Sequence, residues 1–259
     1  MKDNSELYRL IKDTIINLQD NNISFEQYLE VQSKFYQYSV SNMLLILAQN
    51  SEASVLKDDL SWQRESVRIS RKAKPINILE PFFNSSGEVI GYNCKDMYDI
   101  SDTNAKSKRK KYDNRTILKA FLHNNIAEIK GIDDFDDNTI NSIYKINKDG
   151  HNVIYLRRGL DFNDIFKEIS LELANIEIGS KPNEELDKFK KKAIAYLVCK
   201  SHGLNIKDLK IENFPILFRE ISDVQAKKIL GEIRNAVANI NEGIDDYLRS
   251  INRSKNYIR

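Results

Sequence analysis

Apolar residues recur at every third or fourth position through the first fifty residues, which is the spacing of amphipathic helices. This spacing predicts three helices, over residues 3–20, 24–36 and 40–50. The pair Asn21-Asn22 interrupts the pattern, and Ser24 with Gln27 three residues later is typical of a capping box at the start of the second helix. The chain is therefore expected to begin with short helices joined by brief turns.

From residue 62 the pattern changes to short β-rich segments separated by turn residues. It predicts three strands, over residues 62–69, 75–81 and 89–100. The run Asn84-Ser85-Ser86-Gly87 predicts the turn of a hairpin between the last two strands. Helices are thus followed by a small antiparallel sheet, which indicates an α+β fold.

The C-terminal half is mainly helical in its apolar pattern, with a single predicted strand. Helices are predicted over residues 117–129, 163–178, 184–202 and 222–251, and the strand over residues 152–156. Residues 105–114 are polar and basic and are predicted to be a linker. We therefore expect two domains, residues 1–104 and residues 115–259, joined by this linker.

Composition excludes several classes of protein. Of the 259 residues, 41% are hydrophobic and 30% are charged, which is enough apolar material for a core and argues against disorder. No apolar run approaches the roughly 20 residues of a membrane span, and the polar N-terminus has no secretory signal, so we expect a cytoplasmic protein without a membrane partner. Two cysteines make no disulfide framework, and three scattered histidines argue against a multi-histidine metal site.

Positive charge is unevenly distributed, although the formal net charge is only +2. Five cations lie close together in the segment Arg64, Arg68, Arg71, Lys72 and Lys74, and a second basic run spans residues 106–111. A locally basic face on a near-neutral protein is typical of a phosphate-binding footprint. The alternative for both runs is a solvated charged loop.

Several motifs in the N-terminal half occur together in a fixed order. They are YSVSNMLLILAQ at residues 38–49, Trp62-Gln63-Arg64, KPINILEP at residues 74–81 and YDISDT at residues 98–103. In order and spacing this set resembles the N-terminal domain of the ArdC-like and LtrC-like antirestriction proteins of plasmids, conjugative elements and phages, over about residues 24–104. One departure is Lys72-Ala73-Lys74-Pro75, which replaces a Gly-Glu-Lys-Gly turn of that family, so the turn geometry must differ.

The resemblance implies binding of single-stranded DNA, and the residues themselves can be interpreted in the same way. Single-strand binders combine a basic groove with exposed aromatic side chains for base stacking. The predicted DNA-binding residues are Tyr38, Asn42, Trp62, Arg64, Arg68, Arg71, Lys72 and Lys74. For Trp62 the alternative is a place in the core, and for Asn42 it is a capping or packing role.

The C-terminal half resembles the zinc-metallopeptidase domain of the same family, but with the metal ligands lost. The similarity lies in DIFKEISLELA at residues 164–174 and KKKAIAYLVC at residues 190–199. In the family, an H-E-x-x-H helix and a later Glu hold the metal. Carried over by position, the degenerate cleft consists of Lys167, Glu168, Leu171 and Lys192, of which only Glu168 keeps the family's residue. We therefore predict no metal and no other cofactor, and a Lys192–Glu168 ion pair in place of the zinc.

These observations favour a non-enzymatic, single-stranded-DNA-binding protein of a mobile element, in which the peptidase-like domain is a pseudoenzyme. Such a protein would aid DNA protection, replication or transfer by conjugation. One alternative is an inhibitor that binds a host defence protein, or another protein of the element, through the inactive cleft. A second is a residual hydrolase that uses Glu168. The sequence indicates no oligomeric state.

Overall fold

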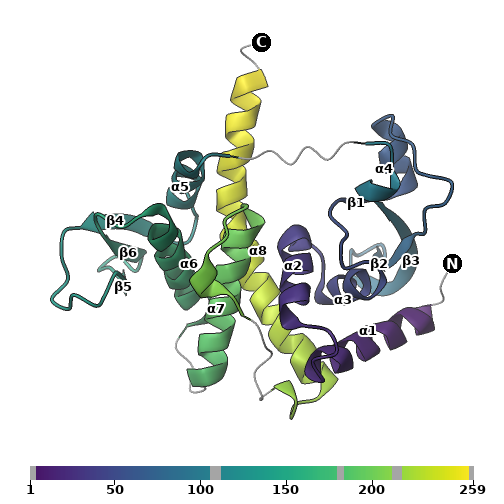
Figure 1. The fold of residues 1–259 in the computed structure, drawn as a ribbon, viewed down its shortest axis with the longest axis horizontal. Helices are drawn as coiled ribbons and strands as arrows, with labels where there is room; N and C mark the ends of the chain where they lie inside the picture. Colours follow the sequence, from purple (N-terminus) through teal and green to yellow (C-terminus); the bar gives the residue numbers. More distant parts are fainter. Residues whose placement is uncertain (1–3, 106–111, 180–183, 212–217, 257–259) are drawn as a thin grey trace. The chain divides into compact units, whose positions relative to one another are not determined.

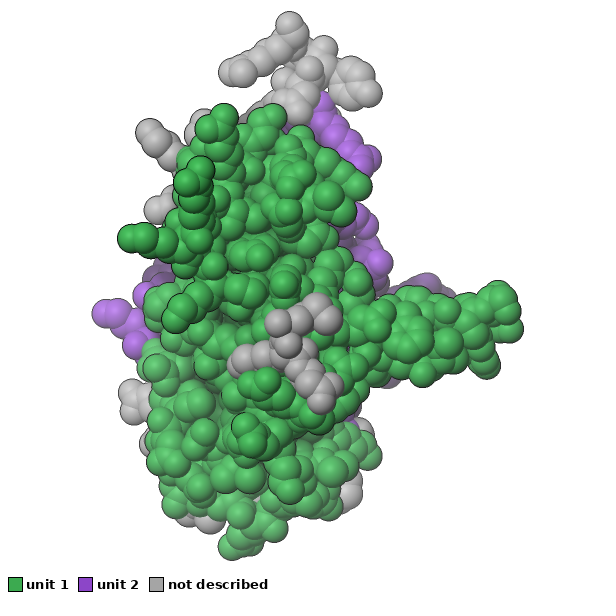
Figure 2. Space-filling model, turned by 90° about the vertical axis from the view of Figure 1, so that its right-hand side faces the viewer, with its two compact units in different colours: residues 1–109, 212–231 green, residues 110–211, 232–259 purple. Residues whose placement is uncertain are grey.

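The computed structural model describes residues 4–105, 112–179, 184–211 and 218–256 (Figure 1). The chain forms two compact units, residues 1–109 with 212–231 and residues 110–211 with 232–259 (Figure 2). Each unit combines helices with a three-stranded sheet, so the protein is α+β as predicted. Within the described residues, no helix is long and apolar enough to cross a membrane.

The division of the chain is more complex than the predicted pair of domains. Residues 106–111 of the predicted linker lie outside the described residues. Residues 212–231 belong to the first unit although they follow most of the second unit in sequence. The boundaries 1–104 and 115–259 therefore remain a prediction.

The first unit begins with the three predicted helices. They are α1 (Asn4–Gln19), α2 (Phe25–Phe35) and α3 (Val40–Gln49). The capping box is confirmed, because the Ser24 hydroxyl accepts from the Gln27 N–H while the Gln27 side chain accepts from the Ser24 N–H. The apolar side chains of α1 and nearly all side chains of α3 are buried, and they form the core of this unit.

The sheet of the first unit has the order β1-β3-β2 and is antiparallel. Its strands are β1 (Leu56–Lys57), β2 (Ile76–Phe83) and β3 (Val89–Asp99), and η1 (Ile100–Asp102) follows β3. The hairpin turn between β2 and β3 is confirmed, with Gly87 at a φ of 81°. A left-handed φ of this kind is readily adopted by glycine, which has no Cβ.

The predicted strand over residues 62–69 is wrong. Residues Asp59–Arg64 form a short helix, α4, because the Asp58 carboxylate caps it by accepting from the Ser61 N–H at 2.7 Å. Only Ile69 makes a strand-like bridge, to Thr103. The cations of this segment therefore do not alternate along one face of a strand.

Two side-chain amides of α3 bind the outer edge of β2. Asn42 Nδ2 donates to the Leu79 carbonyl, and Asn42 Oδ1 accepts from the Leu79 N–H, both at 2.9 Å. Gln49 makes the equivalent pair with Asn77, at 2.9 and 3.0 Å. β2 is an edge strand, so these amides supply the hydrogen bonds that a further strand would have supplied.

The second unit combines a mixed sheet of order β4-β6-β5 with the helices α5, α6 and α7 and most of α8. β4 runs parallel to β6, and β5 runs antiparallel to it. The bounds are α5 (Asn114–Leu122), β4 (Glu128–Ile132), β5 (Ser142–Ile146), β6 (Asn152–Arg157), α6 (Phe162–Ile178), α7 (Glu184–Ser201), η2 (Lys207–Leu209) and α8 (Asp223–Asn256). The strand near 152–156 and the helices near 163–178, 184–202 and 222–251 are confirmed.

Three elements of this unit differ from the prediction. The predicted helix over residues 117–129 ends at Leu122, because the Asn124 side chain accepts from the N–H groups of Ile126 and Ala127 and turns the chain into β4. The strands β4 and β5 were not predicted; the sequence of β5, SIYKI, has only a weak alternation.

Replacing Asn42 by leucine should destabilise the first unit. The leucine has a similar branched shape but leaves the N–H and carbonyl of Leu79 buried without partners, and each such group reduces stability by about 1–3 kcal/mol. Urea denaturation should therefore show a free energy of unfolding lower by at least about 2 kcal/mol. Asn93→Leu, at an exposed position of β3, is the matched control. Equal stability of the two variants would contradict this role for Asn42.

Candidate functional site

Residues 64–74, here called the basic loop, carry the five predicted cations. Arg64, Arg68, Arg71, Lys72 and Lys74 are all exposed. None of their side chains forms an ion pair with a residue that the structure describes. Their charge is therefore not neutralised by described acidic groups of the first unit and is available to an external anion.

The backbone of the basic loop is anchored although its charged side chains are exposed. Ser70 N–H donates to the Asp102 carbonyl at 2.8 Å, and the Asn104 N–H donates to the Arg68 carbonyl at 3.1 Å. The Asn104 side chain also accepts from the Arg68 N–H at 2.8 Å. The loop thus presents its cations from a fixed position beside η1, which reduces the entropy lost when a ligand binds.

Trp62 lies beneath the basic loop and not on its surface. Its side chain is 1% exposed, and its indole N–H donates to the Tyr98 carbonyl at 3.0 Å. The Lys57 ammonium lies 4.7 Å from the ring centroid. Trp62 therefore lies in the core, which is the alternative to a DNA contact, and the indole ring presents no face to a nucleotide base.

Asn42 and Tyr38 also serve the interior of the first unit. Asn42 is 7% exposed, and its amide is fully used by Leu79. Tyr38 is half-buried, with its ring edge-on to Phe35 at 5.8 Å. Burial raises the pKa of the Tyr38 hydroxyl, and the nearby Lys95 only partly opposes this. Of the predicted DNA-binding residues, the structure brings only the five cations together on the surface.

A second candidate site is a cleft of about 400 Å³ between β5, α6 and α7. The residues that matter for its chemistry are Ser142, Glu168, Leu171, Glu172, Lys188 and Lys191. Two of them, Glu168 and Leu171, were predicted to lie in the cleft. Ser142 and the two lysines were not identified from the sequence, because Ser142 lies on the unpredicted strand β5 and the lysines belong to a long polar run.

One serine hydroxyl lies between the two carboxylates of the cleft. Ser142 Oγ is 2.8 Å from Glu168 Oε2 and 3.0 Å from Glu172 Oε1. A hydroxyl has one hydrogen and can donate to only one of them at a time. Glu172 also accepts from the Asn175 amide at 2.8 Å, which fixes its orientation.

The predicted ion pair between Lys192 and Glu168 does not form among the described residues. Glu168 instead lies 3.8 Å from Lys167, whose ammonium is also 3.4 Å from Asp164 and 3.7 Å from Asp208. Lys191, not Lys192, lines the cleft, because each residue turns a helix by 100° and the neighbour points elsewhere. Lys192 therefore lies outside the cleft.

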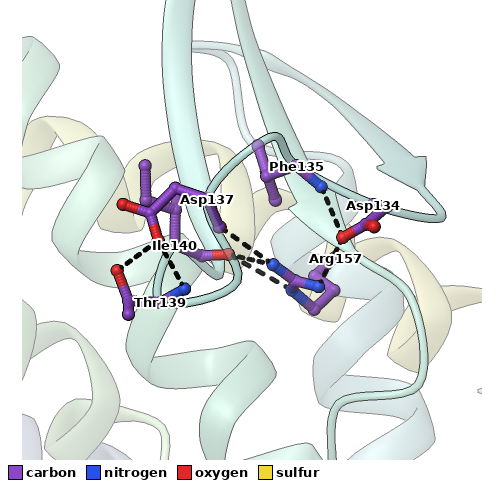
Figure 3. A network of polar contacts seen from close by, with 6 residues as sticks. All are labelled: Asp134, Phe135, Asp137, Thr139, Ile140 and Arg157. Atoms are coloured by element: carbon purple, nitrogen blue, oxygen red, sulfur yellow. Dashed lines mark hydrogen bonds and ion pairs between the residues drawn. The ribbon is translucent and has the colours of Figure 1, made fainter.

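Arg157 holds the loop between β4 and β5, which carries Asp134 and Asp137 and leads into the cleft (Figure 3). Its guanidinium pairs with Asp134 at 2.8 Å, donates to the Ile140 carbonyl at 2.9 Å and lies 5.5 Å from the Phe135 ring centroid. Asp137 accepts from the N–H and hydroxyl of Thr139 at 2.8 and 2.7 Å in the same loop. These contacts position the chain immediately before Ser142.

The donor groups of the cleft do not fit a zinc site of the peptidase type. The positions that correspond to the two histidines hold Lys167 and Leu171, and the ammonium of Lys167 would repel a divalent cation. Within the described ranges, no group of three or more His, Cys, Asp or Glu side chains could hold a metal ion. Burial raises the pKa of the Cys199 thiol to about 12, which opposes its use as a nucleophile.

Comparison with known proteins gives two structural neighbours and no sequence match. No protein-family model matches the chain, and no curated protein matches it either. The metal-free crystal structure of the antirestriction protein ArdC from plasmid R388 is similar at a TM-score of 0.49 and 9% identity, over 92% of this chain and 98% of that one. Its Mn(II)-bound structure has a TM-score of 0.45 at 9% identity, over 84% and 97%. Likeness at this level carries no conclusion about family or function.

His202, at the end of α7, should make stability depend on pH. Its ring lies in the interior, where Nε2 donates to Asn241 Oδ1 at 3.1 Å and Nδ1 lies 3.9 Å from Asp245. Burial lowers the pKa of this imidazole, and the Asp245 carboxylate only partly opposes that. The unfolded chain therefore binds a proton near pH 6.5 while the folded chain does not, so stability should fall as the pH decreases through this value.

Urea denaturation between pH 5 and pH 8 tests this dependence. His202→Gln should have a smaller change in free energy of unfolding across the range, because glutamine does not titrate. If the free energy of unfolding changes with pH by the same amount in both proteins, His202 does not cause the pH dependence of stability.

Proposed function

We propose that this protein binds single-stranded DNA through the basic loop. The observation that carries the proposal is the set of five exposed cations, without ionic partners among the described residues, on an anchored backbone. Lysine and arginine side chains of this kind neutralise phosphates and release counterions, which supplies most of the affinity in sequence-independent binding. Trp62 is buried and does not stack on bases in this proposal; its carbonyl accepts from the Val67 N–H of the loop at 3.0 Å.

The sequence resemblance to ArdC-like and LtrC-like proteins supports a role in a plasmid, conjugative element or phage. In such an element, a single-strand binder would act in antirestriction, in replication or in transfer of DNA. The charge of the basic loop is compatible with each of these roles, since each involves contact with a phosphate backbone.

Neutralising part of the basic loop should weaken DNA binding and reduce its dependence on salt. The variant Arg68→Gln/Arg71→Gln/Lys74→Gln removes three phosphate partners. The slope of log K against log salt should therefore become less steep by about 2, at about 0.7 per phosphate contact. Fluorescence anisotropy of a labelled single-stranded oligonucleotide across a salt series measures both quantities.

Lys119→Gln/Lys148→Gln/Lys207→Gln, at three exposed positions of the second unit, is the control of equal charge. It should bind as the unchanged protein does. An equal loss in both variants would mean that net charge matters and that the basic loop does not.

We further propose that the second unit is not an enzyme. The support is the pair of positions where a peptidase needs histidine and this chain has Lys167 and Leu171. Elemental analysis of purified protein should find zinc well below one equivalent. Stoichiometric zinc that is lost in Glu168→Gln would contradict this proposal and favour a residual hydrolase.

The cleft favours a second candidate function, in which a host or element protein binds there without being cleaved. Its volume of about 400 Å³ lies within the range of ligand sites, and it has carboxylates on α6 and lysines on α7. Leu171→Arg would place a large cation in the cleft and should abolish that binding while leaving DNA affinity unchanged. Failure of the unchanged protein to bind DNA at low salt would make this the leading candidate.

A further inference from the structure

Burial along β2 changes abruptly at its midpoint. Ile76–Leu79 are buried on both faces, whereas Glu80–Phe83 are exposed on both faces. The paired residues Val89–Tyr92 of β3 are also exposed, except that Gly91 is partly covered. Residues 80–92, here called the hairpin arm, thus extend beyond the core of the first unit.

Exposed apolar side chains are concentrated on this arm. Of the twelve large hydrophobic side chains that are exposed among the described residues, five lie here: Phe82, Phe83, Val89, Ile90 and Tyr92. Apolar groups clustered on a surface in this way mark an interaction site.

The strand register orders these side chains on two faces. Pro81 pairs with Tyr92, and Phe83 lies two residues after Pro81 on β2, so Tyr92 and Phe83 share one face. A register shift between Phe82 and Phe83 brings Val89 opposite Phe83. Phe82 lies on the other face across Gly91, where a Cβ would come within 2.5 Å of the phenyl ring. The glycine therefore lets this ring lie against the backbone. Both faces of the arm present an aromatic ring.

The outer edge of the arm is closed to another β-strand. Asn77 and Leu79 turn their backbone groups outward to α3, so Pro81, two residues further, has the same outward orientation. Proline has no N–H to donate, which blocks strand addition at this point. At the β2 edge a partner would therefore contact side chains of the arm and not its backbone.

Three of the five exposed apolar side chains on the arm carry an aromatic ring. Together the five expose on the order of 450 Å², which is comparable to the apolar part of one side of a standard protein interface. Base stacking needs only one ring face for each base, and the adjoining cations of the basic loop favour a nucleic acid as the partner.

The arm is also joined directly to the basic loop. Lys74 is two residues before β2, and the eight positions to Phe82 span about 26 Å in an extended strand. Of the two glutamates on the arm, Glu80 is paired with Lys95, and Glu88 accepts from the Asn84 amide at 2.8 Å. The arm has no cation of its own, so its contribution to nucleic-acid binding would be stacking.

We propose that Phe83 and Tyr92, with Phe82 on the opposite face, form the base-stacking surface for the single-stranded DNA whose phosphates bind the basic loop. The inference rests on the proposed function, because the loop supplies the electrostatic attraction. Stacking needs unpaired bases, and this part of the site therefore discriminates single strands from duplex DNA.

The double variant Phe83→Ala/Tyr92→Ala tests the stacking surface. Each lost stacking contact is expected to weaken binding by about 5- to 150-fold, since such contacts contribute about 1–3 kcal/mol. Affinity for a single-stranded oligonucleotide of about 16 nucleotides should therefore fall at least tenfold at every salt concentration, with an unchanged salt slope. Duplex affinity should not change.

Two further variants of the protein serve as controls for the arm variant. Leu60→Ala/Val224→Ala removes exposed apolar side chains elsewhere in the first unit and should bind normally. Phe83→Trp keeps an aromatic face, should retain affinity, and should give an indole emission that single-stranded DNA quenches. Melting curves confirm that all variants are folded.

The outcomes separate this inference from the proposed function. If the basic-loop variant weakens binding but the arm variant does not, the arm is not the stacking surface and the proposed function stands. If neither variant changes binding, or if the unchanged protein does not bind, both proposals are overturned.

Discussion

The first unit depends on two side-chain amides that take the place of a β-strand. Asn42 and Gln49 bind the backbone of Leu79 and Asn77, and so complete the hydrogen bonds of an edge that is buried. Beyond Leu79 no such partner follows, and β2 becomes exposed on both faces. This one contact therefore determines where the core of the unit ends and where the hairpin arm begins.

Several residues of the N-terminal motifs have a structural role, because their side chains bind backbone groups of the first unit. The Asp99 carboxylate accepts hydrogen bonds from the N–H groups of Ser54, Val55 and Ser101. Burial alone would raise the pKa of Asp99, but these hydrogen bonds hold it below the ordinary value. Trp62 and Asn42 likewise bind backbone groups. The groups left for a ligand are those without an internal role, namely the cations of the basic loop and the rings of the arm.

In the second unit, polar groups of the cleft bind one another. The ammonium of Lys167 lies among three carboxylates, and one hydroxyl lies between Glu168 and Glu172. Because one hydrogen cannot satisfy two acceptors, the cleft keeps an acceptor for a ligand that can donate. Arg157 fixes the adjoining loop by donating to the Ile140 carbonyl, which gives the cleft a fixed wall.

The sequence alone determined most helices, the β2–β3 hairpin and the location of the positive charge, because periodicity, capping and turn residues act over a few positions. It was wrong at residues 62–69, where a local cap by Asp58 favours a helix. It also missed β4, which pairs with β6 in parallel across an intervening strand, and β5, which pairs with β6 as a hairpin. Only the tertiary structure decided that Trp62 is buried, that Phe82 and Phe83 are exposed, and that Lys191 and not Lys192 lines the cleft. Exposure and side-chain orientation depend on what packs against each residue, and no local pattern contains that information.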